Sequence, residues 1–246
     1  MTAFSCIIPA YNEGPRIAAV LECVLRQEEL SEVIVVDDGS RDDTAAIAES
    51  YRSAHPQLRV LRQSVNAGKT AAVARGIAEA QGAHLVFLDS DLLGLTPEAL
   101  GALLAPVAAG RADVSLSLRR NAPRLWHAIG LDYISGERVL PRAMLADRLE
   151  ELHRLPQFGL EVFMNRIWIA EQARIAVVPW PEVDSPMKHD KLGTWRAGLR
   201  ADARMMGDIF RTIGPVQALR QIRHMRGLRV RHDVGALPGT KAAPTR

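Results

Sequence analysis

The feature that most constrains the fold is a repeated unit of apolar run, polar turn and helical stretch across the first ninety residues. The apolar runs cover residues 4–9, 33–36, 58–61 and 85–88, and helix-type spacing of apolar residues covers 12–26, 43–53 and 70–80. Strands that alternate with helices pair in parallel through right-handed crossovers. The sequence therefore predicts an α/β domain with a doubly wound, mostly parallel sheet.

Each predicted strand runs directly into a polar cluster. The clusters are Tyr11-Asn12-Glu13, Asp37-Asp38, Asn66 with Lys69, and Asp89 with Asp91. In open parallel sheets, ligands bind beyond the carboxyl ends of the strands. We therefore expect these clusters to converge on one ligand site.

Asp89-Ser90-Asp91 follows an apolar strand, so both carboxylates are expected to project into the cleft. Mg²⁺ and Mn²⁺ bind oxygen ligands, commonly one or two carboxylates together with substrate phosphates. The segment can thus hold a divalent metal on a diphosphate. The alternative is that the aspartates only cap the loop, which is a common role for this residue in turns.

Two further loops are candidates for nucleotide contacts. A carboxylate of Asp37-Asp38 can accept a hydrogen bond from a ribose hydroxyl or a ring N–H, or can cap the following helix. Residues 66–70 (Asn-Ala-Gly-Lys-Thr) invite a P-loop interpretation, but position 63 is Gln63 rather than the glycine that this motif needs. A glycine turn and Lys69 at a helix start still suit a phosphate-bearing ligand.

Four segments, taken in order, resemble the GT-A fold of family 2 glycosyltransferases. They are residues 7–13 (IIPAYNE), 36–44 (VDDGSRDDT), 66–69 (NAGK) and 87–91 (FLDSD). The resemblance implies that the loop Pro9, Ala10, Tyr11, Asn12 and Glu13, together with Asp38, contacts a nucleotide sugar. It also implies that Asp89 and Asp91, with Ser90 between them, hold Mg²⁺ or Mn²⁺ on its diphosphate.

The second half of the chain is less diagnostic. Apolar runs predict strands at 114–118 and 175–180, helices at 141–153 and 160–170, and a helix over 195–225 that is broken at Gly214-Pro215. We therefore predict a GT-A domain over 1–194, divided near residue 95 into nucleotide and acceptor halves. A basic helical appendage over 195–232 and a disordered tail over 233–246 follow it.

Residues 132–142 resemble the Ser-Gly-x-Arg stretch of the polyprenyl-phosphate sugar synthases in this family, and Gly159-Leu160-Glu161 is similar to their Gly-x-Glu element. Val178-Pro179-Trp180 and residues 188–193 resemble the basic loop that precedes their C-terminal helix. Two positions depart from that pattern, because Leu93 stands where a Gln is common and Glu137 where an aromatic is common. The acceptor therefore stays open between a polyprenyl phosphate and another envelope glycan precursor.

Sugar transfer requires neutralisation of the leaving diphosphate, which a metal and the basic groups Lys69, Arg138 and Lys188 can supply. An alcohol acceptor also needs a base, for which Glu161 is the best candidate, although it can equally be an ordinary helix residue beside Arg166. A phosphate acceptor needs none. His189 is a candidate third metal ligand besides Asp89 and Asp91, or a phosphate-facing residue.

We expect a glycosyltransferase that uses a nucleotide-sugar donor, and the family resemblance favours inversion. A sugar nucleotidyltransferase is the first alternative, but residues 9–14 lack the glycine-rich basic loop expected there. A GT-A-like binding module without catalysis is the second, and the presence of Asp89, Asp91 and Glu161 weighs against it.

The arginines concentrate near the C-terminus, whereas the net charge of the whole chain is only +3. Between residues 195 and 231 they recur at 196, 200, 204, 211, 220, 223, 226, 229 and 231. Such a cluster fits an anionic membrane surface, or is a solvated helix face. We expect no nucleic-acid partner, and nothing in the sequence fixes the oligomeric state.

The two cysteines, Cys6 and Cys23, lack metal-ligand spacing, and no signal peptide or long apolar stretch is evident. These features favour a cytoplasmic protein, either free or peripheral at the inner face of the membrane.

Overall fold

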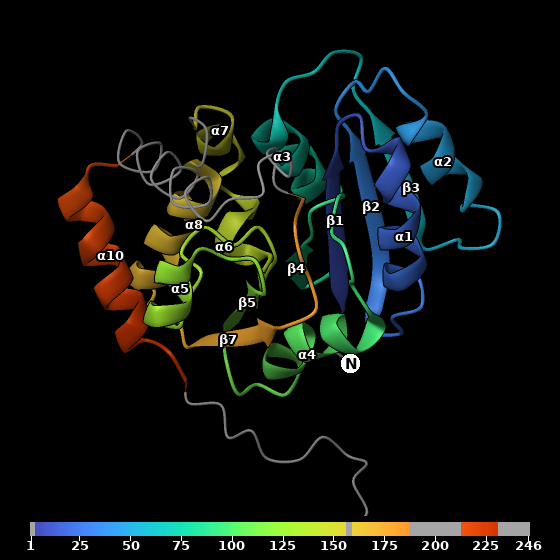
Figure 1. Cartoon of the computed structure of the whole chain (residues 1–246). Coiled ribbons are helices and arrows are strands. Elements are labelled where there is room, and N and C mark those ends of the chain that lie inside the picture. The colour runs from blue at the N-terminus through green and yellow to red at the C-terminus, as the bar shows by residue number, and fades with distance from the viewer. Residues whose placement is uncertain (1–2, 156–158, 187–212, 231–246) are drawn as a thin grey trace, which may run out of the picture.

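The computed structural model describes residues 3–155, 159–186 and 213–230, which contain one seven-stranded sheet with the order β3-β2-β1-β4-β6-β5-β7 (Figure 1). The strands are β1 (Phe4–Ala10), β2 (Leu30–Asp37), β3 (Leu58–Arg62), β4 (His84–Phe87), β5 (Val114–Arg119), β6 (Arg138–Pro141) and β7 (Ile175–Trp180). Only β6 runs antiparallel to its neighbours β4 and β5. The carboxyl ends of the other six strands therefore share one edge, and the predicted α/β class with a GT-A arrangement is confirmed.

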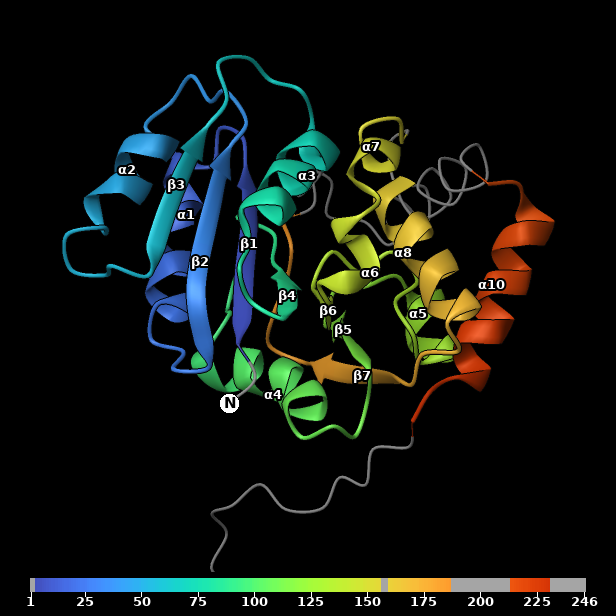
Figure 2. The ribbon, with the colours of Figure 1, turned by 180° about the vertical axis from the view of Figure 1, so that it is seen from behind.

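Helices cover both faces of the sheet (Figures 1 and 2). They are α1 (Gly14–Val24), α2 (Thr44–Ser50), α3 (Lys69–Glu79), α4 (Pro97–Ala108), α5 (Arg124–Ile129), α6 (Ala143–Ala146), α7 (Leu149–Leu152), α8 (Gly159–Ala170) and α10 (Pro215–Gly227). Every residue of β1 is buried, as expected for a strand covered on both sides. Ile7 joins the core beneath α3 and α8, whereas Cys6 and Ile8 join the core beneath α1 and α4.

The predicted continuous helix over 141–153 is wrong. Residues 138–141 form β6, and two single-turn helices, α6 and α7, follow it. Val139 pairs with Val86 of β4 and Ser115 of β5, so the segment fills a gap in the sheet. β6 has only four residues, Arg-Val-Leu-Pro, which is too short a stretch for periodicity to identify it as a strand.

Helix α10 begins at Pro215, as the predicted break at Gly214-Pro215 requires, and residues 195–212 lie outside the described part of the chain. It packs against α8 and contributes Ile222 and Met225 to the core. The backbone after it bonds to β7, since the Val230 N–H donates to the Ile175 carbonyl over 2.9 Å. No helix in residues 3–155, 159–186 or 213–230 combines the length and hydrophobicity needed to cross a bilayer.

Candidate active site

A cleft of about 530 Å³ lies at the shared carboxyl edge of the sheet. It is lined by Pro9, Ala10, Tyr11, Glu13, Asp38, Asn66, Gly68, Lys69, Ala72, Asp89, Ser90 and Asp91. The four predicted polar clusters thus meet around one space. A larger hollow of about 780 Å³, lined by Ala3 and Ser31 among others, lies near the starts of β1 and β2, away from these carboxylates.

Lys69 connects the carboxylates at the centre of the cleft. It is the first residue of α3, after Gly68, whose φ of 91° suits glycine. Its Nζ lies 2.7 Å from Asp89 Oδ1 and 3.6 Å from Glu161 Oε1. Burial opposes the charged form of the ammonium, but Asp89 and Glu161 outweigh it and raise the pKa of Lys69. The lysine therefore stays cationic between two anions.

The pKa values of the two aspartates in the Asp-Ser-Asp segment are shifted in opposite directions. Burial opposes ionisation of Asp89, yet Lys69 and Arg119 hold its pKa below the usual range. Burial, with repulsion from Asp89 and Glu13, raises the pKa of Asp91 to about 6. An unneutralised carboxylate of this kind is an oxygen ligand that gains from a nearby divalent cation.

Asp38 shapes the cleft through the loop before α3. Its Oδ1 accepts hydrogen bonds from the Ala67 N–H over 2.8 Å and from Gln63 Nε2 over 3.0 Å, and its Oδ2 accepts from the Gly68 N–H over 2.8 Å. Asp38 is 3% exposed but still lines the cleft. The carboxylate therefore organises the turn that presents Lys69, a role that the sequence did not indicate.

Asn12 acts as a brace between the loops after β1 and β2. Its φ of 56° is left-handed, a conformation that Asn tolerates. The Asn12 N–H donates to Ser40 Oγ over 2.9 Å, and Asn12 Oδ1 accepts from the Arg41 N–H over 2.8 Å. Asn12 is not among the lining residues, whereas its neighbours Tyr11 and Glu13 are.

The expectation that Arg138 faces the diphosphate is wrong. Its side chain is fully buried, with Nη1 donating to Asn165 Oδ1 over 2.7 Å and Nε donating to the Ser135 carbonyl over 2.7 Å. The guanidinium also lies 4.8 Å from the centre of the Trp168 ring. Arg138 therefore ties β6 to α8 beneath the cleft.

Arg119, which we did not predict, is the arginine whose charge reaches the cleft. It ends β5, and its guanidinium lies 3.4 Å from Glu137 Oε1 and 3.8 Å from Asp132 Oδ2. Its charge contributes to the low pKa of Asp89. The signal was available, because a polar residue at the carboxyl end of a parallel strand is what identified the other clusters.

Gly136, in the Ser-Gly-x-Arg stretch, lies against the Asp89 carboxylate. A Cβ at this position would lie 2.8 Å from Asp89 Oδ2 and 3.0 Å from Asp89 Oδ1. The backbone after Ser135 therefore packs directly on the Asp89 carboxylate, and only glycine leaves it room.

Whether a divalent metal fits this cleft depends on which side chains can act as its ligands. Within the described residues, no three His, Cys, Asp or Glu side chains are grouped to cage an ion. Asp89 and Asp91 nevertheless supply hard oxygen atoms in one cleft, which suits Mg²⁺ or Mn²⁺ completed by substrate phosphates and water. Lys188 and His189, the predicted diphosphate and third metal residues, lie outside the described part of the chain.

Comparison with known proteins places this geometry in context. The model of the family described as Glycosyl transferase family 2 matches residues 5–159, which is more than half of the chain. A dolichyl-phosphate beta-glucosyltransferase of Drosophila melanogaster is 42% identical over 98 residues, covering 35% of this chain and 30% of that protein. A 4,4'-diaponeurosporenoate glycosyltransferase of Staphylococcus aureus is 34% identical over 102 residues, covering 42% of this chain and 27% of that protein. The chain thus spans less than a third of the length of these relatives.

A solved structure gives a longer match. Glucosyl-3-phosphoglycerate synthase from Mycobacterium tuberculosis, in complex with Mn²⁺, uridine diphosphate and phosphoglyceric acid, superposes with a TM-score of 0.61 at 26% identity. The match covers 81% of this chain and 78% of that one.

Proposed function

This chain belongs to glycosyl transferase family 2, and we propose that it moves a sugar from a nucleotide-diphosphate sugar to an acceptor, with inversion and with a divalent metal. The observation that carries the proposal is the convergence of the β1, β2 and β4 ends and of the turn before α3 on one cleft of about 530 Å³. That volume falls in the range of small-molecule sites.

The charges around the cleft support a metal-bound diphosphate. Asp89 and Glu161 lie within 4 Å of the Lys69 ammonium, and Asp91 lines the same cleft. An anionic diphosphate entering this acidic site requires added positive charge. Asp89 and Asp91 would hold Mg²⁺ or Mn²⁺, which neutralises charge on the departing diphosphate. The Mn²⁺ and uridine diphosphate bound to the Mycobacterium tuberculosis synthase support this assignment.

Lys69 has two tasks in the proposed reaction. In the free protein it balances Asp89, with which it forms a 2.7 Å contact. With the donor bound, its ammonium at the start of α3 stabilises negative charge on the phosphates, helped by the helix N-terminus. Arg119, anchored by Glu137 and Asp132, adds positive potential from the β5 side.

Glu161 is the proposed base for an alcohol acceptor. It lies on α8, is 6% exposed, and has Oε1 3.6 Å from Lys69 Nζ. A carboxylate here takes the acceptor proton as the acceptor oxygen bonds to the sugar carbon. The bond from that carbon to the diphosphate oxygen breaks, the nucleoside diphosphate leaves, and this single displacement inverts the carbon. An acceptor phosphate is already anionic and bypasses this step.

For the acceptor we propose a lipid-linked phosphate, a polyprenyl phosphate, or another envelope glycan precursor. The dolichyl-phosphate beta-glucosyltransferases of Drosophila melanogaster and Trichomonas vaginalis, each 42% identical over the matched segment, support this class. The matched segment is only 35% of this chain in both cases.

The experiment that tests the proposal is a panel of nucleotide sugars, each offered with Mn²⁺ or Mg²⁺. Thermal stabilisation and donor hydrolysis are measured for each pair. We expect one sugar nucleotide to raise the unfolding temperature only with metal present, because the site binds metal and diphosphate together. Stabilisation by none of the panel, or equal stabilisation in EDTA, would contradict the proposal.

A further inference from the structure

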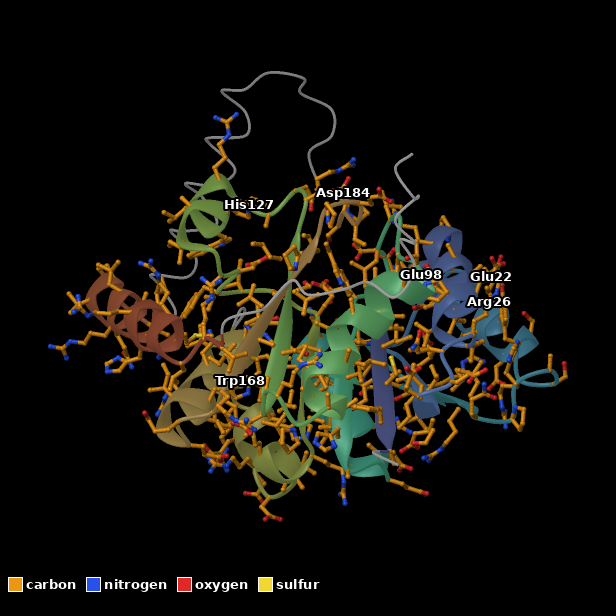
Figure 3. All side chains as sticks on the ribbon, turned by 90° about the horizontal axis from the view of Figure 1, so that it is seen from below. Glu22, Arg26, Glu98, His127, Trp168 and Asp184 are labelled. Atoms are coloured by element: carbon orange, nitrogen blue, oxygen red, sulfur yellow. The ribbon has the colours of Figure 1, made fainter. Side chains whose placement is uncertain are left out.

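Among the helices that the structure describes, the outer face of α10 is the most basic surface that the proposed reaction does not use. Helix α10 (Pro215–Gly227) carries Arg220, Arg223 and Arg226 and contains no acidic residue. All three arginines are exposed, and none forms an ion pair within the described ranges. Nitrogen-bearing side chains project outward from this helix in Figure 3.

The inner face of α10 is fully occupied by the protein itself. Ala218, Ile222 and Met225 are buried, and helix α10 packs on α8. Gln221 Oε1 accepts a hydrogen bond from the Tyr133 hydroxyl over 2.7 Å. The apolar side of this amphipathic helix therefore holds the helix in place and leaves its orientation fixed, with the arginines facing solvent.

Two aliphatic side chains interrupt the basic face. Val216 and Leu219 are each 64% exposed and occupy the first turns of α10, on the same side as Arg220 and Arg223. This end of α10 points towards the edge of the molecule where the carboxyl ends of β1 and β2 lie (Figures 1 and 2). The start of α10, which carries the two aliphatic side chains, therefore lies towards the end of the molecule that holds the cleft.

We propose that the outer face of α10 binds an anionic phospholipid surface. Arginines pair with lipid phosphates, and the exposed aliphatic side chains gain from burial at the boundary between head groups and acyl chains. A soluble polyanion matches the arginines but leaves Val216 and Leu219 in water. The lipid surface therefore accounts for both kinds of side chain.

This inference rests on the proposed function for its purpose, because binding a membrane through α10 would bring the enzyme to a lipid-linked acceptor. The binding itself is measured without any transfer reaction. Failure of one idea is therefore distinguishable from failure of the other.

The test is co-sedimentation with phosphatidylglycerol vesicles and with phosphatidylcholine vesicles, at low and high salt. The variant R220Q/R223Q/R226Q removes three charges from α10. The matched control R26Q/R52Q/R111Q removes three exposed arginines from turns outside α10. Figure 3 places Arg26 on the opposite side of the molecule from α10. A second variant, V216S/L219S, removes the aliphatic contribution and keeps the charge.

We expect the unmodified protein to bind phosphatidylglycerol vesicles at low salt and not phosphatidylcholine vesicles. Each surface arginine contributes about fivefold to the partition, so the triple α10 variant should lose on the order of 100-fold. V216S/L219S should bind more weakly than the unmodified protein. The control variant, whose lost charges lie away from α10, should bind within about twofold of the unmodified protein.

Three results would overturn the inference: no binding to anionic vesicles at low salt, equal losses in the triple variant and its control, or retention on heparin without vesicle binding. The last result would assign the face to a soluble polyanion. Donor hydrolysis without vesicles, measured on every variant, reports separately on the proposed function. It should not change in the α10 variants, because these residues lie outside the cleft.

Discussion

Gly136→Ala tests whether the backbone beneath the cleft sets the position of the Asp89 carboxylate. The new methyl group would stand 2.8 Å from Asp89 Oδ2, 3.0 Å from Oδ1 and 3.1 Å from Cγ. Since carbon and oxygen atoms do not pack closer than about 3.0 Å without repulsion, Asp89 must move. This movement disturbs the 2.7 Å contact between Asp89 and Lys69.

The expected loss follows from the short side chain of Asp89, which has little freedom to move aside without rotating its carboxylate. Displacing a group that orients a metal ligand typically costs 10- to 100-fold in metal affinity or activity, and we expect Gly136→Ala to fall in that range. Overpacking costs about 1–3 kcal/mol of unfolding free energy, partly offset by about 0.4–1 kcal/mol from the stiffer unfolded chain. The protein should therefore remain folded.

The assay is calorimetric titration of Mn²⁺ in the presence of the donor nucleotide, together with thermal unfolding. Gly101→Ala is the matched control, because a Cβ at Gly101 in α4 would meet its nearest neighbour, Gln27 Nε2, at 3.4 Å. It should bind Mn²⁺ like the unmodified protein. Unchanged Mn²⁺ affinity and turnover in Gly136→Ala would refute the reasoning.

Three further predictions address the base, the buried arginine and the pH dependence. Glu161→Gln should lower turnover on an alcohol acceptor by on the order of 10²- to 10⁴-fold in steady-state kinetics, whereas a loss below tenfold would favour an anionic acceptor or another base. Arg138→Met should lower the unfolding free energy by about 1–3 kcal/mol in urea titrations, because Asn165 Oδ1 and the carbonyls of Ser135 and Tyr133 lose their buried hydrogen-bond donor. Arg52→Met at an exposed site should change it by less than about 0.5 kcal/mol. The pKa of Asp91 is raised to about 6, so protonation removes a metal ligand as the pH falls through 6. The apparent Mn²⁺ affinity should therefore be level above about pH 7 and drop by about tenfold per pH unit well below 6. A pH-independent affinity down to about pH 5 would contradict this prediction.

The arrangement of the first ninety residues was predictable because its signals are local. Each strand from β1 to β4 is a short run of mostly apolar residues, and residues that line the cleft follow within a few positions. Strand direction alone therefore places Tyr11, Asp38 and Asp89 at one edge. Composition of the turn could not reveal that Asp38 also binds the backbone of Ala67 and Gly68. That role depends on how closely the β2 and β3 loops approach each other.

The arrangement after residue 95 was harder to predict because it depends on distant partners. β6 is a strand only because β4 and β5 stand on either side of it, and four residues carry no clear period. In the sequence, Arg119 and Arg138 are both arginines and cannot be distinguished by residue type. In the structure their positions differ, because Asn165 and Trp168 enclose Arg138, whereas Arg119 ends its strand beside the cleft.

The central claim is that Asp89 and Asp91 bind the donor diphosphate through a divalent ion. The most direct measurement is donor turnover with Mn²⁺, with excess EDTA, and after Mn²⁺ is restored, for the unmodified chain, Asp91→Asn and the control Asp147→Asn at an exposed position. The account predicts turnover that disappears in EDTA, returns with Mn²⁺, is absent in Asp91→Asn and persists in Asp147→Asn. Full turnover in excess EDTA, or in a folded Asp91→Asn protein, would contradict it.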